Sequence, residues 1–192
     1  MSTQPKSLLT PEQYLEIERK AECKSEYVNG EMFAMSGASE EHNLLTVNLT
    51  VILAPQVRAR GCQLYVSDMR VRVPATGLYT YPDIIVACGQ RQFADAKVDT
   101  VLNPKFLAEV LSPSTEAYDR GRKFEHYQSL ESLSQYLLVA QDRMRADLFT
   151  RQPDSKWILS TASRPEETIA LESVGGRIST ADLYGQVEFP VQ

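Results

Sequence analysis

The chain has 192 residues, of which 43% are hydrophobic, and its 20 basic and 25 acidic residues give a net charge of −5. This length and apolar content predict a single domain over residues 1–192 with an ordinary core, and no run approaches the roughly 18 apolar residues of a membrane span. Residues 1–6 lack the pattern of a secretory signal, so we expect a cytoplasmic protein without a membrane partner.

The N-terminal region predicts a helix followed by a hairpin. The run Thr10-Pro11-Glu12-Gln13 matches a capping box with proline at the first helical position, which predicts a helix over about residues 11–21. Residues 24–28 and 31–35 flank Asn29-Gly30, the strongest short-range signal for a β-hairpin. Both elements precede the main fold.

A longer helix is predicted after Ser39, which can cap it, because Leu45, Leu49 and Ile52 follow helical spacing. We expect Pro55 to kink or end this helix, since its ring removes a donor and clashes with the preceding turn. Residues 62–66 and the alternating run 69–73 then predict two strands, the second half-exposed.

Two apolar runs each contain a single carboxylate. Residues 81–86 hold Asp83 and residues 106–111 hold Glu109, and runs that are apolar on both faces predict interior strands. An unpaired buried charge costs several kcal/mol, so each acid requires a cation or a metal ion.

A polar helix is predicted over about residues 116–130, capped by Ser112-Pro113-Ser114-Thr115. It carries Asp119, Arg120, Arg122, Lys123 and His126. A strand at 135–140 and shorter strand-like runs at 146–150, 157–160 and 168–171 follow, and we interpret the last three as a meander that extends the sheet. The order of elements predicts an α/β fold with a mixed β-sheet flanked by helices.

The two carboxylates suggest metal-dependent phosphodiester chemistry. If their strands are adjacent, Asp83 and Glu109 can converge on one divalent ion, and magnesium prefers such oxygen ligands. A metal ion eases deprotonation of a bound water and offsets charge on the scissile phosphate. Asp83 alone is more often typical of a strand-end turn, so the functional interpretation depends on Glu109 and the following helix as well.

Other polar residues carry weaker signals. Glu40 and Glu41 fit favourable positions near a helix N-terminus, and Asp68 fits a turn better than a ligand. His42 could lie at the edge of an active site or could cap or pack.

The three cysteines are odd in number and widely spaced, so we interpret them as small hydrophobic residues, with neither a disulfide framework nor a zinc site. They are Cys23, Cys62 and Cys88. The acidic net charge means that a nucleic-acid site must be a local basic patch. The candidates are Arg58 with Arg60, Arg70 with Arg72, and Arg120 with Arg122 and Lys123.

Several motifs resemble those of known nucleases. Pro82-Asp83 and Glu109-Val110-Leu111 resemble the PD and (D/E)XK elements of the PD-(D/E)XK superfamily, except that Leu111 replaces the lysine. The chain more closely resembles the Uma-two family of restriction-type endonucleases over roughly residues 8–185. The shared segments are Glu26-Tyr27-Val28-Asn29-Gly30-Glu31, Ser36-Gly37-Ala38-Ser39 with His42-Asn43, Tyr81-Pro82-Asp83, Glu109 to Thr115, Asp119-Arg120 and Lys123.

The resemblance implies a restriction-endonuclease-like core and an endonuclease that hydrolyses phosphodiester bonds in DNA. In such relatives the lysine is often displaced to the following helix, which implies Lys123 as the catalytic lysine, with Asp83 and Glu109 as ligands of Mg²⁺, or of Mn²⁺ as an alternative. Cutting both strands of a duplex implies a homodimer. Leu111 and the acidic charge leave a second hypothesis open, a catalytically degenerate binding or assembly module.

Overall fold

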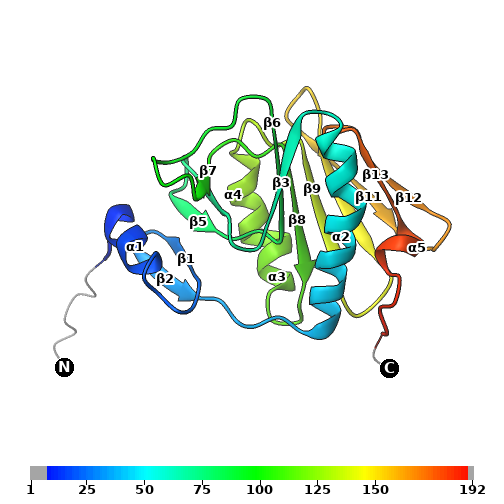
Figure 1. Ribbon diagram of the computed structural model, residues 1–192, viewed down its shortest axis with the longest axis horizontal. Helices are drawn as coiled ribbons and strands as arrows, with labels where there is room; N and C mark the ends of the chain where they lie inside the picture. Colours follow the sequence, from blue (N-terminus) through cyan, green and yellow to red (C-terminus); the bar gives the residue numbers. More distant parts are fainter. Residues whose placement is uncertain (1–7, 190–192) are drawn as a thin grey trace.

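A six-stranded sheet with the order β11-β10-β9-β8-β6-β3 runs through the computed structural model, which describes residues 8–189 (Figure 1). Its strands are β3 (Cys62–Val66), β6 (Ile84–Cys88), β8 (Phe106–Leu111), β9 (Gln135–Ala140), β10 (Ala146–Arg151) and β11 (Trp157–Ala162). The β8–β9 pair is parallel and the other four pairs are antiparallel. The predicted α/β fold with a mixed sheet flanked by helices is therefore confirmed.

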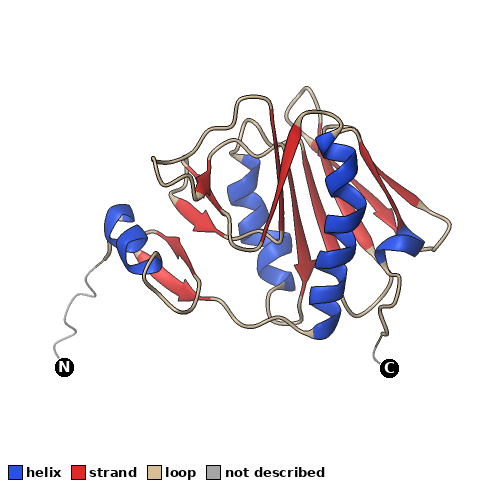
Figure 2. Cartoon of the chain, in the orientation of Figure 1, coloured by secondary structure: helices blue, strands red, loops and turns tan. Residues whose placement is uncertain are grey.

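One face of this sheet is covered by the long helix α2 (Glu40–Arg58), as Figure 2 shows. Its buried leucines pack against Phe106, Ala108 and Val110 of β8 in a first core. The Ser39 hydroxyl accepts a hydrogen bond from the backbone N–H of His42, which confirms the predicted cap. A small hairpin of β12 (Thr168–Leu171) and β13 (Gly176–Ser179) and helix α5 (Thr180–Leu183) complete this layer.

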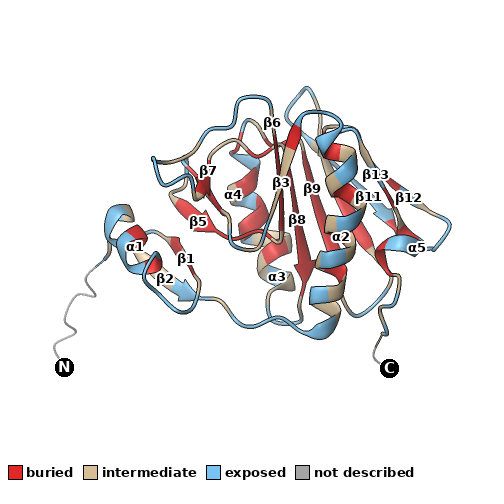
Figure 3. Ribbon diagram, viewed as in Figure 1, coloured by how far each residue is buried: buried red, intermediate tan, exposed pale blue. Residues whose placement is uncertain are grey.

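The opposite face carries a second core. Against it pack α3 (Glu116–Tyr118), the π-helical turn η1 (Asp119–Lys123) and α4 (Phe124–Gln128), which together form the predicted 116–130 helix. A second sheet lies on the same side in the order β2-β1-β5-β4-β7. Its strands are β1 (Ser25–Val28), β2 (Glu31–Ala34), β4 (Arg70–Val73), β5 (Leu78–Thr80) and β7 (Thr100–Val101). Figure 3 shows that β8 is buried along its length, between the two cores.

The N-terminal predictions are confirmed. Helix α1 (Pro11–Glu18) begins with the complete Thr10 capping box. In the hairpin of β1 and β2, Val28 faces Glu31, and Asn29 and Gly30 both adopt positive φ, as a tight hairpin turn requires. The segment 1–6, interpreted above as lacking a secretory signal, lies outside the described residues. No helix in the described part of the chain is long and apolar enough to cross a membrane.

Three details of the sequence prediction are wrong. Pro55 does not end α2, which continues to Arg58. The proline lies on the solvent face, where water can bond the carbonyl of the preceding turn that its missing N–H leaves free, and the buried Val57 anchors the last turn. The strand at 168–171 pairs with β13 rather than extending the main sheet. The strand of Arg70 is not half-exposed, since that guanidinium is buried against Asp99, Thr100 and Tyr81.

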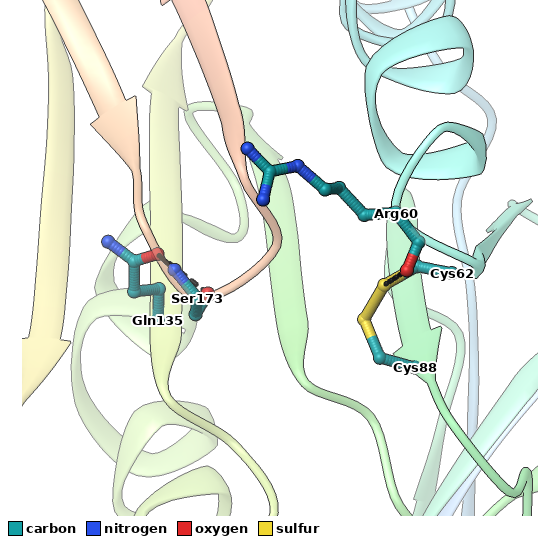
Figure 4. The surroundings of a disulfide bond; sticks show 5 residues. All are labelled: Arg60, Cys62, Cys88, Gln135 and Ser173. Carbon is teal, nitrogen blue, oxygen red and sulfur yellow. Dashed lines mark hydrogen bonds between the residues drawn. A yellow bond between two sulfur atoms is a disulfide. The ribbon is translucent and has the colours of Figure 1, made fainter.

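The interpretation of the cysteines is also wrong for two of them. Cys62 and Cys88 face each other in the antiparallel pair β3–β6, with Cα atoms 4.1 Å apart, and they form a disulfide (Figure 4). They are 26 residues apart in sequence, so only the register of the two strands brings them together. Cys23 remains an exposed free thiol. Disulfides are rare in the cytoplasm, so this bond argues against the cytoplasmic location expected from the sequence.

We predict that reduction of this disulfide lowers the free energy of unfolding by roughly 3 kcal/mol. The bond joins residues 26 positions apart, and breaking it opens this loop in the unfolded chain, which raises the entropy of that state. Urea unfolding with and without dithiothreitol measures the difference. A Cys62→Ser, Cys88→Ser double variant should have the stability of the reduced protein, and this stability should be the same with and without dithiothreitol. Equal stability of the oxidised and reduced native protein would contradict the prediction.

Candidate active site

Asp83 and Glu109 lie side by side at one end of the β6–β8 pair. Ile84 of β6 faces Ala108 of β8, so the antiparallel register carries Asp83, just before β6, to the position beside Glu109. The backbone N–H of Val110 donates to Asp83 Oδ2 at 2.8 Å, which ties the two strand ends together. The condition set in the sequence analysis, that the two acidic strands are adjacent, is therefore met, although Asp83 precedes its strand rather than lying within it.

The Lys123 ammonium lies at the centre of three carboxylates. Its Nζ is 2.9 Å from Glu109 Oε1, 3.2 Å from Glu26 Oε1 and 3.3 Å from Asp119 Oδ1. The four side chains are between 5% and 12% exposed, so the cluster is nearly dry. Sequence reasoning placed Lys123 near Glu109 and Asp119, and the structure brings these three together.

The π-helical turn η1 presents both Asp119 and Lys123 to the interior. Single π turns are frequent at functional sites because they shift side chains away from the regular helical face. Aromatic rings wall the cluster: the Tyr127 hydroxyl donates to Glu109 Oε1 at 2.9 Å, and the Tyr118 ring lies 5.9 Å from the Lys123 ammonium. The helix thus supplies the cation and part of its apolar surroundings.

Burial has the largest effect on the pKa values of the cluster, in which one cation lies among three acids. Burial raises the pKa of Glu109 well above its ordinary value, and the charges of Asp119 and Asp83 raise it further, against the opposing effect of Lys123. Burial likewise raises the pKa of Asp119. Burial opposes a charged lysine, yet the surrounding carboxylates outweigh this effect and raise the pKa of Lys123. The site therefore keeps Lys123 protonated, and Glu109 and Asp119 hold protons more readily than exposed carboxyl groups do.

His42 approaches the site from the first turn of α2. Its Nε2 lies 3.0 Å from Asp83 Oδ1, and the two side chains are 18% and 16% exposed. Both Asp83 oxygens thus have protein partners, Nε2 of His42 and the N–H of Val110. Of the alternatives left open for His42, the structure favours a place at the edge of the site.

The remaining candidates lie elsewhere or are neutralised. The Asp68 side chain is 91% exposed and pairs with Lys24, as expected for a turn residue. Leu111 is buried in the second core. The prediction that Arg70 belongs to a basic patch for nucleic acid is wrong, because Arg70 is buried and paired with Asp99. Arg120 is likewise paired, with Glu116 and Asp147.

Sequence reasoning missed the contribution of Glu26, which reaches the cluster from β1. The only sequence signal for Glu26 was its place in a segment shared with the resembled family. Nothing in the residue spacing indicated that an N-terminal hairpin would contact a helix about 100 residues later in the chain. The Thr80 hydroxyl of β5 donates to the same Glu26 oxygen that contacts Lys123. The second sheet therefore completes the site.

The donor chemistry fits a hard divalent cation, since Asp83 and Glu109 offer carboxylate oxygens and the cluster carries surplus negative charge. Across residues 8–189, no group of three or more His, Cys, Asp or Glu side chains is arranged to hold a metal ion. A two-carboxylate site completed by water and substrate is thus the arrangement that these residues allow.

We predict that Lys123→Met destabilises the fold by about 3–5 kcal/mol, because it leaves three buried carboxylates without their cation. Urea unfolding near neutral pH measures the loss. The matched control is Lys20→Met, which removes the exposed Lys20–Glu16 pair at 2.9 Å and should leave the stability almost unchanged, because solvent screens this pair. Equal stability of the two variants would contradict a structural role for the buried ammonium.

Comparison with known proteins identifies the family and the fold of the chain. The uncharacterized proteins sll1609 and slr1290 of Synechocystis are 37% and 33% identical to the chain, over 80% and 94% of it and 86% and 94% of their own lengths. The crystal structure of "a putative nuclease belonging to DUF820" from Anabaena variabilis shares the fold, with a TM-score of 0.76 at 16% identity, over 92% of this chain and 98% of that one. The family model Uma2, described as "Putative restriction endonuclease", matches residues 11–181. The chain belongs to the Uma2 family.

Proposed function

We propose that this protein is a divalent-metal-dependent endonuclease that hydrolyses phosphodiester bonds in DNA. The observation that carries the proposal is the meeting of Asp83 and Glu109 on neighbouring strands, with the Lys123 ammonium 2.9 Å from Glu109. Membership of a restriction-endonuclease family supports a nucleic-acid substrate, and such enzymes generally use divalent metals.

Each residue of the site has a role in this proposal. Asp83 and Glu109 would hold Mg²⁺ or Mn²⁺, and His42 and the Val110 N–H keep the Asp83 carboxylate in place. When bound, the ion supplies a water that deprotonates readily and offsets negative charge on the phosphate. Lys123 would orient the attacking water or stabilise the developing oxyanion, which replaces the function of a lysine at the Leu111 position.

A second candidate function, a degenerate binding or assembly module, has one observation in its favour. The three carboxylate contacts of Lys123 use all three donors of its ammonium, so the site as observed leaves none for substrate. Calorimetry with magnesium or manganese separates the two functions. Binding heat that vanishes in Glu109→Ala favours the enzyme, whereas no difference between native protein and variant favours the module.

We predict that Asp83→Asn lowers metal-dependent cleavage of plasmid DNA by at least about 100-fold, the usual effect of removing one member of a catalytic set. The matched control is Asp68→Asn, which makes the same change on an exposed side chain and should cleave like native protein. A plasmid-nicking assay with Mg²⁺ and with Mn²⁺ measures both. Failure of the native protein to cleave any DNA form with either ion would overturn the proposed function.

We further propose that the enzyme acts as a homodimer, because cutting both strands of a duplex calls for two active sites related by symmetry. Sedimentation velocity on a short duplex should show two chains per DNA. A complex containing a single chain at every protein concentration would contradict this part of the proposal.

A further inference from the structure

Glu26 is held in the site by contacts on both sides. Its side chain is 12% exposed, and Oε1 is 3.2 Å from Lys123 Nζ and also accepts the Thr80 hydroxyl. The Tyr118 ring lies 5.9 Å from the same ammonium, so Lys123 is enclosed on this side as well. A buried carboxylate so closely engaged is part of the site rather than of the hairpin surface.

The three carboxylates around Lys123 differ in what else they can do. Glu109 is the acid that the proposed function assigns to the metal ion, and a cation on its carboxylate competes with the Lys123 ammonium. Asp119 lies one turn before Lys123 on the same helix, so it moves with the lysine. Glu26 alone belongs to a separate sheet, and it therefore fixes the ammonium relative to another part of the fold.

The donor count makes this difference matter. A lysine ammonium has three N–H donors, and Glu109, Asp119 and Glu26 occupy all three. If Glu109 turns to a metal ion, one donor becomes available for substrate while two carboxylates still retain the ammonium. Without Glu26, only Asp119 would remain, and the long lysine side chain would lose its fixed position.

We propose that Glu26 is a positioning residue that keeps the Lys123 ammonium beside Glu109 when a divalent ion occupies the Glu109 carboxylate. This inference rests on the proposed function and deepens it. Glu26 acts through Lys123 and is not itself a ligand of the ion, so its loss should misplace the lysine without weakening metal binding.

The test follows the Lys123 ammonium directly, by proton–nitrogen NMR of protein labelled with ¹⁵N-lysine and titrated with Mg²⁺. The native protein should show a slowly exchanging ammonium signal, assigned by its absence from Lys123→Met, that shifts but persists at saturating Mg²⁺. In Glu26→Gln the signal should persist without metal and vanish with it. Glu26→Asp keeps the charge and should restore the signal in part, and it serves in place of the glutamine variant if that variant does not fold.

Calorimetry and kinetics on the same proteins separate positioning from metal ligation. Glu26→Gln should bind Mg²⁺ with native affinity while its kcat falls roughly 10- to 100-fold at unchanged KM, as expected for a misplaced catalytic group. The matched control is Glu22→Gln, the same change on an exposed residue of the preceding loop, which should behave as native in every measurement.

Three outcomes would overturn the inference. A Glu26→Gln signal that persists at saturating Mg²⁺ would show that Glu26 does not retain the lysine, and a matching fall in Mg²⁺ affinity would make Glu26 a ligand instead. In either case the nuclease proposal stands. If the native protein gives neither a binding heat nor a shift of the ammonium signal with Mg²⁺ or Mn²⁺, the proposed function fails together with this inference.

Discussion

One buried ammonium shared by three carboxylates is the constraint on which this fold depends. Lys123 contacts Glu109 of the main sheet, Asp119 of its own helix and Glu26 of the second sheet, all within 3.3 Å. Each carboxylate would be costly to bury alone, and the lysine would be equally costly without them. The main sheet, the helix and the second sheet are thus joined through one buried polar cluster.

The same arrangement separates the stability of the site from its chemistry. Burial, with a smaller contribution from the neighbouring carboxylates, raises the pKa values of Glu109 and Asp119 although a lysine lies beside both. A cluster optimised for stability alone would balance its charges or replace them with apolar side chains. The retained excess of negative charge beside Asp83 is what a site for a divalent cation requires, and it motivates the nuclease proposal.

Much of the fold could be predicted from local patterns, because a capping box, an Asn-Gly turn and apolar runs each act over a few residues. The two lone acids in apolar strands were recognisable for the same reason, but their proximity depended on the pairing of β6 with β8, which the sequence left as a condition. The contact of Glu26 with Lys123 and the Cys62–Cys88 disulfide were not predictable, since each depends on which strands pair and in what register. Pro55 shows the converse, a strong local signal that solvent exposure overrides.

The nuclease proposal requires that Asp83 and Glu109 share one divalent ion within reach of the Lys123 ammonium. Anomalous diffraction from crystals grown with Mn²⁺ tests it most directly, because the scattering locates the ion without reference to activity. We predict one strong peak between the two carboxylates, with Glu26 and Asp119 still on Lys123. A fully occupied peak elsewhere, or none at saturating Mn²⁺, would contradict the account.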